Sequence, residues 1–184
     1  MKSYFPGTVI ERNGQNAEEF LLGIFSFTKG LMLAQVKEIT GLDAPAIQNW
    51  INRGWVRKPV DKRYDADQLS RIMIINMLRD VMKLEHIAAL LAYFSDTNDA
   101  PVVTDAQLYC YLCKILDTVD FETILSQEEL QDKIERVTGD ETGRDAGYRR
   151  KLIDGMEIIL TYYASCIIKK QADRLYRRIL KEGE

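Results

Sequence analysis

Four polar side chains are predicted to lie on one face of a short helix, and they are Gln48, Asn49, Asn52 and Arg53. A helix advances about 100° per residue, so Ile47, Trp50 and Ile51 share the opposite, inward face. Asn and Gln side chains pair with adenine through two hydrogen bonds, and Arg pairs in the same way with guanine. The outward face therefore has the chemistry to read base edges, although a solvated helix surface has the same composition.

Four cations follow this helix within a short stretch, and they are Arg57, Lys58, Lys62 and Arg63. With Arg53 and Asp61 included, the eleven residues 53–63 carry a net charge of +4. Lysine and arginine contacts to phosphate supply sequence-independent affinity and fix the orientation of a protein on a duplex. Pro59 in this stretch favours a loop or an edge position. We therefore expect a phosphate-contacting loop directly after a base-reading helix.

Two short helices joined by a tight turn must position these side chains. The spacing of apolar residues predicts one helix over 33–40 and a second that begins after Asp43. Gly41 can end the first helix in a left-handed conformation, and Asp43 can cap the second. Two strongly apolar helices, over 65–83 and 85–94, are expected to pack behind them. This order of helix, turn, polar-faced helix, basic loop and apolar helix predicts a winged helix-turn-helix.

Residues from about Met32 to Phe94 resemble the DNA-binding domain of MerR-type transcriptional regulators. The matching residues of the reading helix and its exit are Ile47, Trp50, Gly54, Trp55 and Val56. Those of the wing and of the two following helices are Pro59, Tyr64, Leu69, Ile72, Leu78, Leu84, Ile87 and Leu91. The longer string GLDAPAIQNWINRGWVRKPVDKRY resembles an uncharacterised bacterial family of MerR-like proteins known as a domain of unknown function.

The resemblance implies a recognition helix in the major groove and wing contacts to the phosphate backbone. It adds Tyr64 to the four cations of the loop as a predicted phosphate contact. MerR-type proteins usually carry arginine where Gln48 stands, tyrosine where Asn49 stands and arginine where Lys62 stands. We therefore expect the docking geometry to be kept while the groove contacts differ residue by residue.

The net charge of −3 over 184 residues conceals an uneven distribution. Residues 29–94 hold ten basic and seven acidic side chains, 95–145 hold four and thirteen, and 146–184 hold nine and five. The total argues against a protein that coats DNA without sequence preference, but not against contact at one small site. With 46 % hydrophobic residues, the chain is expected to fold around a core rather than to be disordered.

The cysteines and the N-terminus predict a cytoplasmic protein. Cys110, Cys113 and Cys166 are odd in number and irregularly spaced, which predicts no disulfide framework. The CxxC pair falls on the apolar face of a predicted helix, which favours buried thiols over a zinc or redox site. The first residues lack the pattern of a signal peptide, and no apolar run reaches the roughly 20 residues of a membrane span.

Three segments are predicted along the chain: a lead-in over 1–30, the MerR-like domain over 31–95, and a helical dimerisation or effector domain over 102–184. The last contains one long helix over about 148–180, whose two apolar stripes predict burial on two sides near its middle. Two roles compete for this helix. It either joins two copies or forms the core of a domain that senses an unknown small molecule.

Together these features predict a mainly α-helical protein that binds double-stranded DNA at specific sequences and regulates transcription as a homodimer. We expect no cofactor, no metal, no membrane partner and no enzymatic activity, because no nucleophile and base or phosphate loop stands at a recognisable spacing. The alternative is a protein-docking module that uses the same scaffold without DNA, with the acidic middle segment facing a basic partner.

Overall fold

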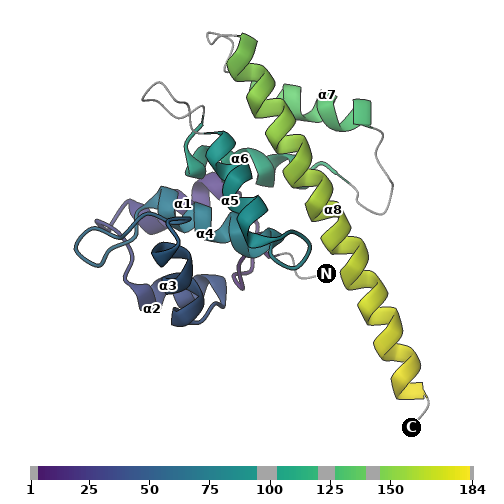
Figure 1. Cartoon of the computed structure of the whole chain (residues 1–184), viewed down its shortest axis with the longest axis horizontal. Helices are drawn as coiled ribbons and strands as arrows, with labels where there is room; N and C mark the ends of the chain where they lie inside the picture. Colours follow the sequence, from purple (N-terminus) through teal and green to yellow (C-terminus); the bar gives the residue numbers. More distant parts are fainter. Residues whose placement is uncertain (1–3, 95–102, 120–126, 140–145, 183–184) are drawn as a thin grey trace.

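The computed structural model describes residues 4–94, 103–119, 127–139 and 146–182, and within them it is mainly α-helical (Figure 1). The helices of these ranges are α1 (Ala17–Phe25), α2 (Leu33–Thr40), α3 (Ala44–Asn52), α4 (Ala66–Leu78), α5 (Leu84–Tyr93), α6 (Asp105–Leu116), α7 (Gln127–Thr138) and α8 (Ala146–Glu182). The described residues form isolated β-bridges but no strand. The predicted helical class is confirmed.

Helix α4 lies at the centre of the fold and contacts α2, α5, α6 and α8 (Figure 1). Its fully buried apolar side chains are Leu69, Ile72, Met73, Ile74, Ile75 and Leu78. Asp65 begins the helix by accepting the Gln68 amide at 2.8 Å. The helix ends at Leu78, and a last turn follows in which the Val81 and Met82 amides both donate to the Leu78 carbonyl, at 3.0 and 2.9 Å. The prediction of one helix over 65–83 is therefore wrong at its C-terminal end.

The predicted lead-in segment contains a helix, α1, which is not among the predicted elements. Asn16 and Glu19 form a capping box in which each side chain accepts the backbone amide of the other. Phe20 on this helix stacks on Phe5 with ring centroids 4.3 Å apart, and α1 packs against α6. The N-terminal segment is thus part of the folded body.

The second half of the chain packs directly onto the first. Helix α6 lies against α4, and α7 lies against α6 and α8. Arg71 Nε on α4 lies 2.7 Å from Asp105 Oδ2 on α6, and the Ala106 amide donates to Asp67 Oδ1 at 2.9 Å. Buried side chains from both halves form one hydrophobic cluster. The residues between the second and third predicted segments, 96–101, lie outside the described residues.

The long C-terminal helix is confirmed, but its surroundings differ from the prediction. The N-terminal part of α8 packs on the body, where Gly155 lets Phe94 approach so closely that a Cβ would lie 2.3 Å from its ring. The C-terminal part projects away from the other helices (Figure 1). Its apolar side chains are exposed, and they are Ile168, Leu175, Tyr176, Ile179 and Leu180. Two-sided burial near the middle is therefore wrong, because Ile158 on the outer side is also exposed.

Among the described helices, none combines the length and the apolar composition that crossing a bilayer requires.

Candidate nucleic-acid interface

The turn between α2 and α3 is fixed by local hydrogen bonds. The Thr40 hydroxyl donates to the Val36 carbonyl at 2.7 Å and accepts the Leu42 amide at 3.3 Å. Gly41 has a φ of 69°, the left-handed conformation that commonly ends a helix at glycine. Asp43 then accepts the Ala46 amide at 2.9 Å and begins α3. The orientation of α3 relative to α2 is thus set within a few residues.

Helix α3 presents two chemically different faces. Ile47, Trp50 and Ile51 are buried, as the helical periodicity predicts. The four predicted contact residues are all exposed, and they are Gln48, Asn49, Asn52 and Arg53. The structure therefore presents their amide and guanidinium groups to solvent on one side of a helix whose other side is anchored in the core.

Arg53 is the most constrained member of this set. Its Nε donates to Asn49 Oδ1 at 3.4 Å, and its Nη1 lies 3.3 Å from Glu85 Oε1. The guanidinium carbon also sits 5.0 Å from the centre of the Trp55 ring. The pair with Glu85 is exposed, and exposed pairs contribute little, so Arg53 can exchange this carboxylate for a phosphate or a base at small cost.

A basic loop, defined here as residues 55–64, follows α3. The Arg63 amide donates to the Val60 carbonyl at 2.8 Å, and Asp61 and Lys62 between them have φ values of 49° and 60°. These values are those of a type I′ turn, which presents the two central side chains at a tip. The loop predicted over this stretch therefore contains a turn, with Asp61 and Lys62 at its centre.

The base of the basic loop is tied to the segment that precedes α2. Leu31 and Tyr64 exchange two backbone hydrogen bonds of 2.9 and 2.8 Å, and Arg63 Nη1 donates to the Gly30 carbonyl at 3.0 Å. From α4, Gln68 Nε2 also donates to the Arg57 carbonyl at 2.8 Å. These contacts connect residues far apart in sequence, and sequence periodicity gave no sign of them.

The four predicted phosphate-contacting cations, Arg57, Lys58, Lys62 and Arg63, are all exposed. Arg57 Nη2 lies 3.2 Å from Asp65 Oδ2, in an exposed pair. Lys58 and Lys62 form no ion pair with any side chain that the structure describes. Most of the charge of the basic loop therefore faces solvent beside the polar face of α3.

Tyr64 does not belong to this surface. Its side chain is only 1 % exposed, and burial raises the pKa of its phenol. A phenol enclosed in the core offers no donor to a phosphate in the surrounding solvent. Tyr64 is therefore removed from the predicted phosphate contacts, and its role is to anchor the base of the basic loop in the core.

The CxxC cysteines lie inside α6 rather than at its start. Cys110 and Cys113 are both buried, and burial raises their thiol pKa to about 11 and about 12. Both thiols are therefore protonated near neutral pH, whereas metal binding and thiol exchange need the thiolate. Within the described ranges, no group of three or more His, Cys, Asp or Glu side chains could hold a metal ion.

Comparison with known proteins bears on this region of the chain. Residues 25–112 match a family model described as "Domain of unknown function (DUF1836)". That match agrees with the predicted resemblance to a family of unknown function. It begins at the last residue of α1 and ends within α6, so it contains α2, α3, the basic loop, α4 and α5.

The chain is also similar to the "Uncharacterized protein YkrK" of Bacillus subtilis (strain 168), with 29 % identity over 116 residues. The aligned region covers 58 % of this chain and 49 % of the relative, so it spans about half the length of the curated protein that it matches. A search of solved structures gives no match.

Proposed function

We propose that this protein binds double-stranded DNA at specific sequences and regulates transcription, with α3 as the recognition helix of a winged helix-turn-helix. One observation carries the proposal: the exposed amide face of α3 adjoins the solvent-facing cations of the basic loop. The resemblance to MerR-type regulators supports the same assignment.

The dimensions of the interface suit a duplex. A helix with its side chains is about 10 to 12 Å across, which fits a major groove roughly 12 Å wide, and the nine residues of α3 extend about 14 Å along the helix axis. Gln48, Asn49 and Asn52 would reach base edges, and Lys58 and Lys62 would contact phosphates as a wing does. In sequence, Arg53 lies between the α3 amides and the loop lysines, and it can contact either a base or a phosphate. Specificity would then reside in α3 and most of the salt-dependent affinity in the basic loop.

Selection from a library of random duplexes tests the proposal, with affinity then measured across salt concentrations. We expect an enriched motif and an affinity that falls as salt rises. Asn49→Ala should change the preferred base at one position, whereas Lys58→Ala with Lys62→Ala should weaken all duplexes alike and flatten the salt dependence. Failure to enrich any motif, together with affinity independent of salt, would remove the proposal.

A matched control keeps the charge argument specific. Arg149→Ala with Arg150→Ala removes two exposed cations at the start of α8, far along the chain from the basic loop. The total charge changes equally in both double variants, so only the loop variant should lose affinity. Capture of a protein from a nuclease-treated lysate, with no motif enriched from the library, would favour the docking-module alternative.

We further propose that α8 joins two copies in an antiparallel pair. Ile168, Ala172, Leu175 and Ile179 recur at the four- and three-residue steps of a heptad seam, and their exposed stripe continues back to Ile158. In an antiparallel arrangement that faces Ile158 with the partner's Leu175, the acidic start of the stripe lies beside the basic end of the other copy. The acidic residues are Asp154 and Glu157, and the basic residues are Arg177 and Arg178. A parallel pair would instead place the two basic ends together.

Sedimentation equilibrium tests the dimer. Leu175→Glu with Ile179→Glu places charges on the proposed seam and should leave a monomer that retains its helical circular dichroism. Lys170→Glu, on the side of the same helix opposite the seam, should remain dimeric. If the unaltered protein is a monomer at tens of micromolar, the pairing of α8 is wrong, whereas the DNA proposal still stands or falls by the selection experiment.

A further inference from the structure

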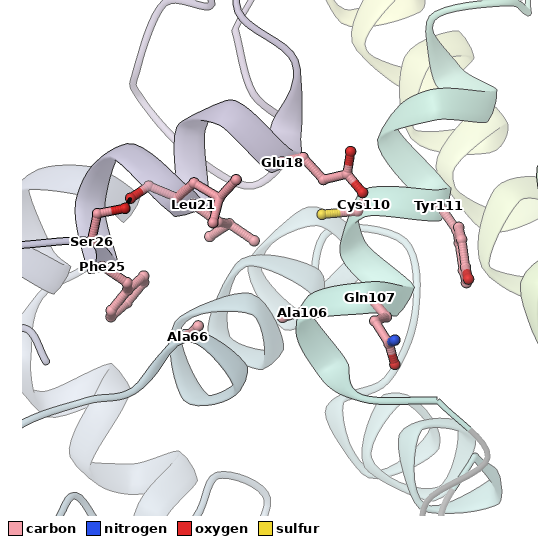
Figure 2. Close-up of a pocket in the computed structure, with 10 residues that line it drawn as sticks. Glu18, Leu21, Phe25, Ser26, Ala66, Ala106, Gln107, Cys110 and Tyr111 are labelled. Carbon is pink, nitrogen blue, oxygen red and sulfur yellow. Dashed lines mark hydrogen bonds between the residues drawn. The ribbon is translucent and has the colours of Figure 1, made fainter. Parts of the chain in front are cut away.

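A cleft lies between α1, the first turn of α4 and α6 (Figure 2). Its volume is about 420 Å³, within the 300 to 1,000 Å³ typical of small-molecule sites. The wall is mainly apolar, and Figure 2 shows Leu21, Phe25, Ala66, Ala106 and Cys110 around it. The small side chains at Ala66 and Ala106 leave the space open.

Polar groups are few and lie at particular places in this cleft. Among the ten described lining residues, Glu18 is the one with a charged side chain. Its carboxylate lies 3.5 Å from Lys114 Nζ, and both side chains are about half exposed. Such a long and exposed pair is weak, so the carboxylate can accept another cation. Burial, together with the negative charge of Glu18, raises the pKa of the Cys110 thiol to about 11, so this part of the wall is uncharged near neutral pH.

The mouth of the cleft exposes apolar surface that a ligand would cover. Leu22 lines the cleft and is 65 % exposed. Covering such side chains is favourable in proportion to the apolar area removed from water. An apolar body can therefore lie against Leu22 and Phe25 while a cationic group reaches Glu18 at the rim.

We propose that this cleft binds a small molecule with an aromatic or branched aliphatic body and one positively charged amine. The body would pack between α1 and α6, and the amine would pair with the Glu18 carboxylate in place of Lys114. A ligand that carries a carboxylate in place of the amine is disfavoured. Once its apolar body lies in the cleft, its negative charge would be partly removed from water and placed beside the Glu18 carboxylate. The sequence placed a possible effector site in the domain over 102–184, whereas this cleft uses α1 and α4 as well.

The position of the cleft gives a bound ligand a direct connection to the basic loop. Ala66 is the first residue of α4 and stands two positions after Tyr64. The segment that leaves α1 reaches Leu31, which pairs with Tyr64, and Gly30, which accepts Arg63. A ligand that changes the spacing of α1 and α4 would therefore displace the base of the loop. This consequence for DNA rests on the proposed function, whereas ligand binding itself does not.

Three naphthalene compounds of similar size test the site: naphthylethylamine, naphthylethanol and naphthylacetate. Titration of the full-length protein, followed by amide chemical shifts without DNA, should give the tightest binding for the amine and the weakest for the carboxylate. The shifts should move in α1 and α6 and extend to Leu31 and Tyr64. Equal affinity for all three compounds, or shifts confined to other helices, would overturn the proposal.

Two exposed substitutions sharpen the test without disturbing the core. Glu18→Gln should weaken the amine about fivefold and leave the alcohol unchanged, because an exposed ion pair contributes about 1 kcal/mol at most. Leu22→Lys places a cation at the mouth and should reverse the preference from amine to carboxylate. The matched controls are Glu19→Gln on the same helix and Ala89→Lys on α5, and neither should alter the order of affinities.

The outcomes separate this inference from the proposed function. Amine binding at α1 and α6 in a protein that selects no DNA motif, and whose affinity for DNA is independent of salt, would support the site and remove the DNA proposal. A DNA motif with no amine preference would do the reverse. If both hold, naphthylethylamine should change the affinity for the selected duplex, and Leu22→Lys should abolish that change.

Discussion

Replacing Arg71 by alanine is expected to lower the free energy of unfolding by about 3 kcal/mol, because it leaves the Asp105 carboxylate covered and without its partner. The two side chains are 19 % and 17 % exposed, and Arg71 Nε lies 2.7 Å from Asp105 Oδ2. Arg71 Nη1 also donates to the Trp55 carbonyl at 3.3 Å. Losing that second contact adds about 1 kcal/mol and loosens the chain where it enters the basic loop.

The ion pair between Arg71 and Asp105 contributes less net stability than the cost of removing Arg71 suggests. Burial raises the pKa of the Asp105 carboxyl, and the hydrogen bond and charge of Arg71 lower it only in part. Desolvation therefore outweighs the attraction between the two groups. The double variant Arg71→Met with Asp105→Leu removes both charges together, so it should cost clearly less than the sum of the two single substitutions.

Urea unfolding followed by circular dichroism measures this cycle. We expect a coupling energy of about 1 to 3 kcal/mol between the two positions. Arg71→Lys is the matched control, because it keeps the charge but loses the second donor to Trp55. Additive costs for the two single substitutions, within about 0.5 kcal/mol, would refute the argument that the covered carboxylate depends on Arg71.

The same carboxyl gives a pH dependence with a defined sign. Because burial raises the pKa of Asp105 in the folded chain above its ordinary value of 3.8, the folded chain holds this proton more tightly than the unfolded chain. The stability that Asp105 contributes is therefore fully present below the unfolded pKa of 3.8, and it is lost as the pH rises through the folded pKa. Asp105→Asn removes this contribution, so the stability of the unaltered protein relative to the variant should fall as the pH rises above the ordinary aspartate value.

Three further outcomes follow from particular residues. Lys62→Asn should stabilise the protein by up to about 1 kcal/mol in urea unfolding, since asparagine tolerates the left-handed φ of 60°, whereas Lys62→Val should destabilise it. Gly7→Ala should cost about 3 kcal/mol or more, because its Cβ would lie 2.0 Å from the Met73 carbonyl oxygen at a φ of 73°. At pH 8 the Cys110 thiol, with a pKa of about 11, should react with a disulfide reagent about a hundredfold more slowly than in urea; fast labelling of the folded protein would contradict its burial.

Local patterns in the sequence were sufficient to predict α3. Its cap at Asp43, its inward residues Ile47 and Trp50 and its outward amides all follow from spacing within one helix. The length of α8 was predictable for the same reason, because no proline interrupts it. These features depend on neighbours in sequence, and helical periodicity records such neighbours directly.

Features that depend on distant partners were missed. Tyr64 was read as a wing contact, and only its pairing with Leu31 and its enclosure in the core reveal an anchor. The outer stripe of α8 was expected to be buried, because apolar composition does not say whether a covering element exists. Helix α1 did carry a signal, the Asn16 and Glu19 capping box, but its apolar run is short. The cleft beside α1 depends on the separation of two helices, which no local pattern encodes.

The anchoring of α8 at one end makes the helix a lever. Its last 16 residues, 167–182, project over about 24 Å, and they extend from a region that Phe94 contacts at Gly155. A rotation of about 10° at that contact would move the far end by about 7 Å, because the helix extends about 40 Å beyond Gly155 and bends little. That displacement exceeds the rise of one helical turn. A ligand or a core substitution that moves Phe94 by a fraction of an ångström would therefore be amplified at the C-terminal tip, and fluorescent labels placed on α2 and near residue 178 would record the change in distance.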